Sequence, residues 1–470
     1  MARHAQIAAL MLAVHLCQAA AGQCYLDALV GSASSTADEQ GVSVGLDGSL
    51  AVLGAHLDDP LGEDSGSAYV FRESLGAWVE EARLTPSDGA AHDRFGESVD
   101  VSNDTIVVGA ARHADDRGAA YVFRFDGAEW SQEAKLSPAA AEPDDFIALA
   151  VAIDGNVIVL GAVGDDDGCG GAPASSAGAA YIFRYDGARW VEEAKLLDPD
   201  CEAGAQFGRS VAVSGDVVVV GAARDAGPSQ PFESGSASFF RYSGGAWIFE
   251  QKVWASDAEQ GEWFGWACAV DGNSAVITAR RDDDTGAESG SGYVYQYLPT
   301  IHQWYFEQKL VSDDAGAFAQ MGYSASIDGA FVVLGAVGSG VGTPGAGAAI
   351  PFLRRAPGVW AQLDPLVTDP AATGDRLGAS VDVHEGRVIA GAPAHDYRRI
   401  DDGAAFLFSV SPSCDCRVDM TGDGLLDLFD FLEFLKAFNR GDPIADFTGD
   451  GILDIFDFLE FQSEFAIGCS

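Results

Sequence analysis

One pattern recurs seven times through the middle of the chain and constrains the fold more than any other feature. The dipeptide Gly-Ala follows an aliphatic or β-branched run in six copies, and Thr278-Ala279 takes its place in the seventh. Successive copies lie 52 to 60 residues apart, and a tryptophan keeps step with them. The glycines are Gly54, Gly109, Gly161, Gly221, Gly335 and Gly391, and the tryptophans are Trp78, Trp130, Trp190, Trp247, Trp304 and Trp360. Periods of this size are typical of propellers and solenoids.

Each copy contains four short segments with the pattern of β-strands. In the second copy these segments are residues 98–101, 105–108, 119–124 and 130–136. Turn pairs such as Asp47-Gly48, which accept positive φ and suit close hairpins, join the first two segments. No apolar stripe with a 3.6-residue period runs through any copy, so a helical repeat is disfavoured. The pattern therefore predicts a mainly β protein with seven four-stranded propeller blades.

The seventh copy lacks a fourth strand of its own. After residues 404–410 the chain turns at Ser411-Pro412-Ser413, with no tryptophan following. Residues 25–30 read YLDALV, and we expect them to supply the missing strand and to close the ring. Cys24 would then begin a strand beside the one that leads to Cys414, which predicts a disulfide between them.

A second motif precedes the first strand of most copies. It reads Phe95-Gly96, Phe207-Gly208 and Phe264-Gly265, is softer at Met321-Gly322 and Leu377-Gly378, and lacks the glycine at Asp145-Phe146-Ile147. Together with Gly391-Ala392-Pro393, these residues resemble the FG-GAP repeat, the blade unit of integrin α-chain propellers and of many exported bacterial proteins. The resemblance implies that residues 23–411 form one propeller. Several blades of that family carry a DxDxDG calcium loop between their first two strands, but the turns here are too short to surround a cation, so none is predicted in the propeller.

The chain is strongly acidic, with 71 Asp and Glu against 27 Lys and Arg and a net charge of −44. Such a charge repels phosphate backbones and excludes nucleic acid as a partner. Many of the acids fall between the second and third strands of a copy, and successive blades would place these loops on one rim. They are Asp58, Asp59, Glu63, Asp64, Asp115, Asp116, Asp165, Asp166, Asp167, Asp282, Asp283, Asp284, Asp401 and Asp402. We expect one negative face, which is either a solvated surface or a platform for a ligand or cation.

Residues 1–22 have the features of a signal peptide. Arg3 and His4 precede an apolar run from Ile7 to Leu16 that is too short to span a bilayer. We therefore expect a secreted or cell-surface protein with no transmembrane segment in the mature chain. Seven cysteines would remain, and an oxidising compartment can keep disulfides. The sequence leaves the connectivity open, and the pairing that we favour is Cys24–Cys414, Cys169–Cys201 and Cys416–Cys469, with Cys268 as a free, buried thiol.

A duplicated acidic segment follows in residues 412–470. Residues 419–430 read DMTGDGLLDLFD, and residues 446–457 read DFTGDGILDIFD. A calcium loop needs oxygen ligands at positions 1, 3, 5, 7, 9 and 12, with glycine at position 6. The first loop offers Asp419, Thr421, Asp423, the Leu425 carbonyl, Asp427 and Asp430, and the second offers Asp446, Thr448, Asp450, the Ile452 carbonyl, Asp454 and Asp457. We therefore predict two Ca²⁺ sites.

The paired loops resemble a dockerin, the module that attaches exported bacterial proteins to a cohesin receptor. The resemblance implies a small α-helical domain over residues 412–470 and a protein partner, either cohesin-like or another surface receptor. Loop positions 10 and 11, which often carry Ser or Thr for recognition in dockerins, are Leu428-Phe429 and Ile455-Phe456 here. The eight phenylalanines of the two expected helices either form the core of the module or face another surface. They are Phe429, Phe431, Phe434, Phe438, Phe456, Phe458, Phe461 and Phe465.

No catalytic signature is present in the sequence. It contains no HExxH pair, and we predict no catalytic residue. We expect an exported, non-catalytic binding or scaffold protein whose propeller presents a face to a carbohydrate or protein ligand and whose tail anchors it. Two alternatives stay open, namely an extracellular carbohydrate-active lyase or hydrolase built on the same propeller, and a purely structural surface protein.

Overall fold

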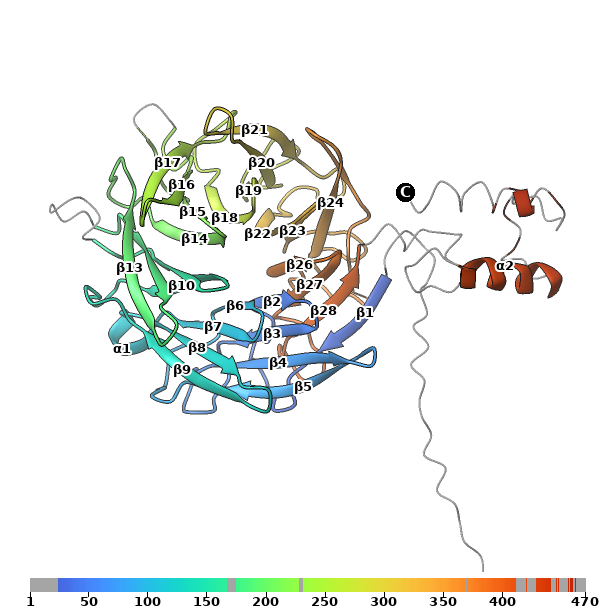
Figure 1. The fold of residues 1–470 in the computed structure, drawn as a ribbon, viewed down its shortest axis with the longest axis horizontal. Coiled ribbons are helices and arrows are strands. Elements are labelled where there is room, and N and C mark those ends of the chain that lie inside the picture. The colour runs from blue at the N-terminus through green and yellow to red at the C-terminus, as the bar shows by residue number, and fades with distance from the viewer. Residues whose placement is uncertain are drawn as a thin grey trace, which may run out of the picture. The chain divides into compact units, whose positions relative to one another are not determined.

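The seven copies fold into seven four-stranded antiparallel sheets, which stand as blades around a common axis (Figure 1). The computed structural model describes residues 24–166, 175–227, 231–368, 370–410, 420, 428–440, 445, 447, 455, 457–459 and 461. Residues 27–411 form one compact unit, and helix α2 (Leu428–Arg440) belongs to a second unit that is treated separately below. The predicted seven-bladed β-propeller is therefore confirmed.

The strands follow the order of the sequence within each blade. The first three blades are β2 (Val44–Asp47), β3 (Leu50–Ala55), β4 (Ser67–Ser74) and β5 (Ala77–Leu84), then β6 (Ser98–Ser102), β7 (Thr105–Ala110), β8 (Ala119–Phe125) and β9 (Trp130–Leu136), then β10 (Ile147–Asp154), β11 (Val157–Ala162), β12 (Ala179–Tyr185) and β13 (Trp190–Leu197). The next three are β14 (Phe207–Ser214), β15 (Val217–Ala222), β16 (Ser236–Ser243) and β17 (Ala246–Val253), then β18 (Phe264–Asp271), β19 (Ser274–Ala279), β20 (Ser291–Leu298) and β21 (Gln303–Leu310), then β22 (Met321–Asp328), β23 (Phe331–Ala336), β24 (Ala348–Ala356) and β25 (Val359–Gln362). The short turn α1 (His113–Asp116) lies between β7 and β8.

The seventh blade is completed by the N-terminal strand. It contains β26 (Ser380–His384), β27 (Arg387–Ala392) and β28 (Ala404–Ser409), and β1 (Cys24–Leu29) pairs with β28 as its outermost strand. The predicted closure of the ring by residues 25–30 is thus confirmed. Cys414 lies outside the described residues, so its pairing with Cys24 stays a prediction.

The second strand of each blade carries the continuous apolar run seen in the sequence. Every residue of β3, β7, β11, β15 and β19 is buried, because neighbouring blades cover both faces of these strands. The outermost strands instead alternate between exposed and half-buried residues, as in β5 and β9. The cores therefore lie between blades rather than inside any one of them.

Glycines allow adjacent blades to approach unusually closely. A Cβ atom on Gly54 would lie 1.9 Å from the carbonyl oxygen of Gly96 in the next blade, and one on Gly66 would lie 2.0 Å from that of Phe95. Gly66 also has a φ of +81°, which favours glycine. Parallel bridges repeat this contact around the ring at Gly66–Phe95, Gly118–Ile147, Gly178–Phe207, Gly235–Phe264, Gly290–Met321, Gly347–Leu377 and Gly403–Gln40. In the third blade the pair Ile147-Ala148 fills the Phe-Gly position, one residue after the phenylalanine of the motif quoted above.

A hydroxyl group reinforces most of these junctions. Serine two places after the Phe-Gly glycine donates to a carbonyl of the following blade, as in Ser43 to Gly96 at 2.8 Å. Equivalent bonds run from Ser98 to Ala148, Ser210 to Gly265 and Ser324 to Gly378. The fifth blade has Ala267 at the serine position, and there Thr278 donates to the carbonyl of Gly322 at 2.7 Å. The threonine that replaces the Gly-Ala glycine thus supplies the missing hydroxyl.

The recurring tryptophans join the outer strands of neighbouring blades. The indole Nε1 of Trp130 donates to Glu81 of the previous blade at 2.9 Å, and Glu81 also accepts from Arg72 of its own blade. The same tryptophan-to-glutamate bond recurs from Trp190 to Glu133, Trp247 to Glu193, Trp304 to Glu250 and Trp360 to Glu307. This outer girdle explains why tryptophan keeps the period of the repeat.

The described residues of the C-terminal unit include a small aromatic core. Phe434 of α2 stacks on Phe461 with ring centroids 4.1 Å apart, and both are fully buried. Phe447 packs edge-on against both rings. Most of the described phenylalanines therefore serve the module's own core, while the exposed apolar side chains there are Leu432, Ile455 and Leu459.

Cys268 is a free, buried thiol, as predicted. Burial raises its pKa to about 12, so it is unreactive near neutral pH. The signal peptide and the proposed partners Cys169, Cys414, Cys416 and Cys469 lie outside the described residues. In the described part of the chain, no helix has the length and apolar character needed to cross a membrane.

Two substitutions test whether Thr278 supplies the junction hydroxyl that serine supplies in the other blades. Thr278→Gly removes the hydroxyl that bonds Gly322 and should lower the free energy of unfolding by about 1–3 kcal/mol. Adding Ala267→Ser should recover much of the loss, because it recreates the Ser and Gly pair of the other blades. Urea denaturation measures both changes.

Ala267→Ser alone is the control. In other blades the serine Oγ lies only 2.2–2.4 Å from a Cβ built on the facing glycine, so serine and threonine should crowd each other. A double variant no more stable than Thr278→Gly would contradict this account of the junction.

Candidate ligand-binding site at one mouth of the channel

The innermost strands of the blades surround a central channel. Three cavities that share lining residues follow it, with volumes of about 220, 400 and 230 Å³. Their walls come from β2, β6, β10, β14, β18, β22 and β26, which all run in the same direction along the axis. The two ends of the channel therefore differ in chemistry, because one collects the starts of these strands and the other collects their ends.

Aspartates dominate the end at which the innermost strands finish. The last residue of each of these strands is Asp47, Ser102, Asp154, Ser214, Asp271, Asp328 or His384. Asp154 accepts the backbone N–H of Gly215 at 2.6 Å, and Asp271 accepts that of Gly329 at 2.8 Å, so each carboxylate holds the hairpin of the next blade. These acids have a structural role that accounts for their presence.

Two further aspartates lie deeper in the channel wall. Burial, reinforced by the negative charge of Asp382, raises the pKa of Asp100 to about 8. Burial also raises the pKa of Asp382 to about 6. Asp100 accepts the backbone N–H of Ile153 at 2.7 Å, and Asp382 accepts that of Leu46 at 2.7 Å, so both also join adjacent blades.

The opposite mouth is formed by the residue that follows the Phe-Gly pair of each blade. These residues are Val42, Glu97, Leu149, Arg209, Trp266, Tyr323 and Ala379, and all seven line the cavity of about 230 Å³. Their neighbours in sequence repeat from blade to blade, whereas these residues differ. The repeat thus builds a constant frame around one variable ring.

Arginines stack on tryptophans at this mouth. The guanidinium carbons of Arg209 and Arg280 lie 3.8 and 3.6 Å from the ring centre of Trp266. Trp263 lies nearly parallel to Trp266, with centroids 5.5 Å apart, and carries the guanidinium of Arg281 at 3.8 Å. We call these five residues the arginine–tryptophan cluster. Arginine stacks well on indole because the ring face is electron-rich.

The charge of Glu97 acts on Arg209 and that of Glu288 acts on Arg280, but neither carboxylate forms an ion pair with these two arginines. Within the described residues, neither Arg209 nor Arg280 makes a hydrogen bond or ion pair through its guanidinium, and the Nε of Arg280 is buried without a partner. Burial lowers the pKa of Arg209, and burial together with the charges of Arg209 and Arg281 lowers the pKa of Arg280 to about 10. Both shifts reflect positive charge held in a partly dry place.

Carboxylates also lie near this positive mouth, and Glu288 comes within 3.9 Å of the Nε of Arg281. Glu97 lines the same cavity, and its Oε2 is buried without a hydrogen-bond partner. Burial raises the pKa of Glu97, and the nearby arginines Arg94, Arg112 and Arg209 oppose that rise. The mouth therefore holds free hydrogen-bond donors on one side and a free acceptor on another.

Comparison with protein families matches the chain to the FG-GAP repeat. The matched segments are residues 27–71, 78–123, 130–183, 190–240 and 247–295, which together cover just over half of the chain. The chain belongs to the FG-GAP repeat family. No match was found among the curated proteins. Among solved structures, a crystal structure of a protein from Lactobacillus plantarum is similar at 14% sequence identity and a TM-score of 0.47, and the alignment covers 72% of this chain and 86% of that chain.

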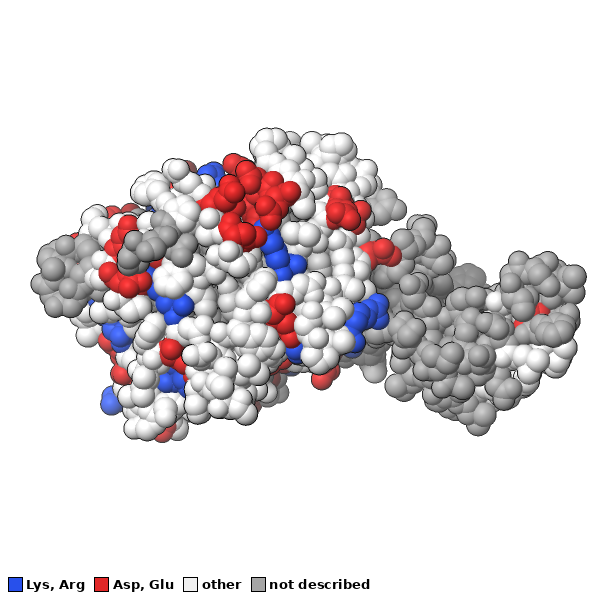
Figure 2. Space-filling view, turned by 90° about the horizontal axis from the view of Figure 1, so that it is seen from above, with Lys and Arg blue, Asp and Glu red and all other residues white. Residues whose placement is uncertain are grey.

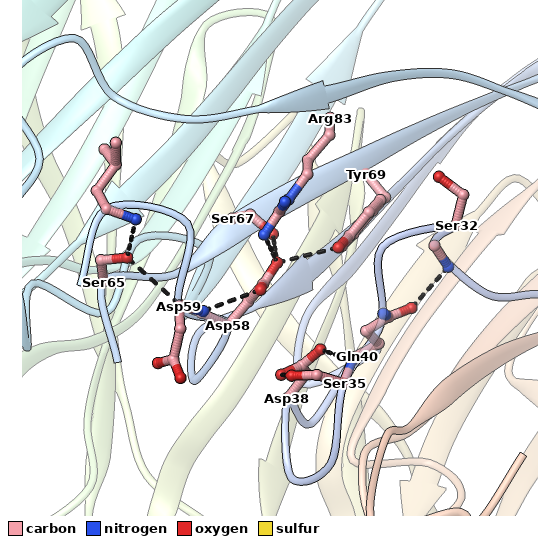
Figure 3. A network of polar contacts seen from close by, with 12 residues as sticks. Ser32, Ser35, Asp38, Gln40, Asp58, Asp59, Ser65, Ser67, Tyr69 and Arg83 are labelled. Carbon is pink, nitrogen blue, oxygen red and sulfur yellow. Dashed lines mark hydrogen bonds and ion pairs between the residues drawn. The ribbon is translucent and has the colours of Figure 1, made fainter. Parts of the chain in front are cut away.

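In this FG-GAP propeller, several aspartates of the predicted acidic loops are buried and hydrogen-bonded rather than exposed on the rim. Asp58 is buried, and its carboxylate accepts hydrogen bonds from Ser67, from the hydroxyl of Tyr69 at 3.0 Å and from Arg83 (Figure 3). Asp165 is held in the same way by Tyr181 and Lys195. These aspartates tie the loop to the third and fourth strands of their own blade.

The same position is buried in other blades of the FG-GAP propeller. Asp225 pairs with Lys252 at 2.8 Å, and Asp282 accepts from Tyr293 at 2.9 Å. The exposed acids of these loops are Asp59, Glu63, Asp115, Asp166, Asp283 and Asp284. Figure 2 shows acidic patches on one side of the molecule with basic side chains between them. The predicted single negative face is therefore interrupted, because Asp58, Asp165 and Asp282 are buried and paired with basic residues of their own blade, and arginines occupy the centre of the same rim.

Acidic trios on the fifth blade do not make a convincing cation site. Asp257, Asp282 and Asp284 converge, but the Nζ of Lys309 already lies between them at 2.5–2.8 Å. Glu259, Glu262 and Asp283 form a second trio, and burial raises the pKa of Glu262 to about 7. Lys309 thus occupies the centre of the first trio. In the second trio, the raised pKa of Glu262 makes that carboxyl a poorer cation ligand.

Most of the predicted calcium ligands lie outside the described residues. Only Asp430 and Asp457, at position 12 of the two loops, are described, and both side chains are fully buried. Asp430 lies in the first turn of α2, which begins at Leu428. Asp419, Thr421, Asp423, Leu425, Asp427, Asp446, Thr448, Asp450, Ile452 and Asp454 lie outside the described residues.

Sequence reasoning missed the arginine–tryptophan cluster altogether. Its members come from the fourth and fifth blades and carry no motif. The available signal was variation at a fixed place, since the residue after Phe-Gly is Glu97, Arg209, Trp266 or Tyr323 in different copies. A search for departures from the repeat would have found this ring.

The buried channel carboxylate should make stability depend on pH. The pKa of Asp100 in the folded protein exceeds the ordinary value, so its ionisation costs stability, and the cost grows as pH rises from about 4 to 8. Asp100→Asn mimics the protonated form. It should match the wild type near pH 4 and exceed its unfolding free energy by on the order of 1 kcal/mol or more at pH 8.

Thermal melts at several pH values measure this difference. Asp271→Asn, which replaces another carboxylate that accepts a backbone N–H of the next blade, is the matched control. An Asp100→Asn variant that is less stable than the wild type at pH 8 would contradict the prediction.

Proposed function

We propose that this FG-GAP protein is an exported, non-catalytic binding or scaffold protein, which takes a ligand at the arginine-lined mouth and is attached to a surface or extracellular complex by its C-terminal module. The observation that supports binding is the pair Arg209 and Arg280, whose guanidiniums have no partner among the described residues. Holding positive charge in a partly buried place without an anion costs stability. A ligand that supplies the anion would account for it.

The proposed attachment depends on calcium. Twelve oxygens at the spacing of calcium loops are available in residues 419–457, with eight aspartates among them. Asp430 and Asp457, which take position 12 of the two loops, are fully buried. When bound, Ca²⁺ would connect the two loops to the helices that follow them, and a cohesin-like or other surface receptor would be the partner.

An enzyme remains the second candidate, favoured by the channel carboxylates. Asp100 and Asp382 line the same cavities, and their pKa values are raised to about 8 and 6. A protonated carboxyl could act as a general acid on a glycosidic bond. Their hydrogen bonds to backbone N–H groups of neighbouring blades, however, give a sufficient structural reason for both residues.

Calcium binding can be measured on the full chain by titration calorimetry. We expect uptake of about two ions, because two complete ligand sets are present. Asp423→Ala combined with Asp450→Ala should abolish that uptake, since each removes a carboxylate at position 5. Chelation should melt the C-terminal module in a separate low-temperature transition and leave the propeller transition unchanged.

Asp283→Ala with Asp284→Ala is the matched control, since it removes two exposed acids from a propeller loop. If calcium uptake persists in the Asp423→Ala, Asp450→Ala variant but is lost in this control, the calcium site lies in the propeller and the prediction is wrong.

A panel of acidic and neutral polysaccharides separates binding from catalysis. Retention of one polysaccharide on immobilised protein without release of shorter products is the expected result, because the mouth offers unpaired arginines rather than a catalytic pair. Product release that disappears in Asp100→Asn would favour the enzyme. Chromatography of the supernatant detects either outcome.

A further inference from the structure

We infer that the arginine-lined mouth binds a single sugar-acid residue, with its carboxylate on Arg209 and Arg280 and a hydroxyl on Glu97. The inference rests on the proposed function, in which this mouth is the ligand face. It adds the chemical class of the ligand and the role of each of the three side chains.

The stacking of the arginines determines which edge a ligand can reach. A guanidinium lying flat on an indole keeps its N–H groups in its own plane, pointing away from the ring. The guanidinium carbons of Arg209 and Arg280 both lie within 4 Å of the ring centre of Trp266, and neither guanidinium has a hydrogen-bond partner among the described residues. Such edges fit a planar oxyanion, above all a carboxylate, through paired hydrogen bonds. Because the stacking already restricts the two arginine side chains, they lose little conformational entropy when a ligand binds.

The remaining polar group requires a donor from the ligand. The Oε2 atom of Glu97 is buried without a partner in the cavity that Arg209, Trp266 and Tyr323 also line. A hydroxyl on the ligand would satisfy this oxygen. The serine hydroxyls of the same cavity do not compete, since Ser43, Ser98, Ser210 and Ser324 donate to carbonyls of the next blade. A ligand with both a carboxylate and a hydroxyl therefore matches the mouth better than a simple anion.

Charge and size exclude the main competitors. The carboxylate of Glu97 would repel a phosphate dianion. A ligand with one negative charge and a hydroxyl could instead donate a hydrogen bond to Glu97. The cavity of about 230 Å³ is below the range of about 300–1,000 Å³ for drug-sized ligands, so it has room for roughly one sugar ring. Exposed acids such as Asp283 and Asp284 lie on the loop that follows Arg280 and Arg281, and they would repel a polyanion laid flat across this face. We therefore expect the terminal residue of an acidic saccharide to enter end-on.

The test is calorimetric titration of the intact protein with four probes. These are galacturonate, galactose, acetate and the peptide N-acetyl-glycyl-serine. Galacturonate should bind at least tenfold more tightly than galactose, which lacks the carboxylate, and than acetate, which lacks the hydroxyl. Equal binding of galacturonate and galactose by the wild type would overturn the inference, as would tighter binding of the peptide.

Variants assign the roles within the mouth. Arg280→Lys keeps the charge but loses the paired donors, and Arg209→Gln removes a charge, so both should weaken galacturonate at least tenfold. Glu97→Ala should weaken galacturonate but not acetate, which distinguishes a hydroxyl acceptor from general damage. Arg189→Gln, which replaces an exposed arginine in the turn between β12 and β13, is the matched control and should bind like the wild type. Thermal melts check that each variant is folded.

Failure of this inference can be told from failure of the proposed function. If galacturonate does not bind but another ligand from the polysaccharide panel is lost in Arg209→Gln, the mouth is the ligand face and the sugar-acid assignment is wrong. If every ligand binds equally to the wild type and to all mouth variants, both are wrong.

Discussion

Close contact between the backbones of neighbouring blades is the constraint on which the rest of this structure depends. Gly54 and Gly66 in one blade approach Gly96 and Phe95 of the next so closely that no side chain fits between them. The apolar cores, the hydroxyl bonds and the tryptophan girdle all act across the same boundaries. Stability therefore arises between blades, and no blade has a complete core without its neighbours.

This origin explains what could be predicted from the sequence. Gly-Ala, Phe-Gly and tryptophan each serve one contact that recurs around the ring, so their period revealed the number of blades, the strand order and the closing strand β1. The junctions even account for the exception, because Thr278 supplies the hydroxyl that Ala267 lacks. A periodic physical requirement leaves a periodic trace in the sequence.

The candidate site leaves no such trace. Arg209, Trp263 and Arg280 are far apart in sequence and meet only because the ring brings the starts of the inner strands together. The acidic loops misled for a related reason, since the partners of Asp58 and Asp165 are tyrosine and basic residues on later strands. Counting charges along the chain did not reveal which of them are paired in space. The described part of the C-terminal module supports an internal aromatic core, and its ligand loops remain predictions.

The position of β1 has a consequence for how the molecule is made. This strand leaves the ribosome first, yet its partner β28 emerges only after six blades have been synthesised. Until then the ring is open, and the blades at its two ends each expose an apolar face that the closed ring buries. Correct folding thus requires β1 to remain unpaired until β28 of the same chain has been synthesised. Pairing of β1 with β28 of a neighbouring chain would instead give a domain-swapped dimer.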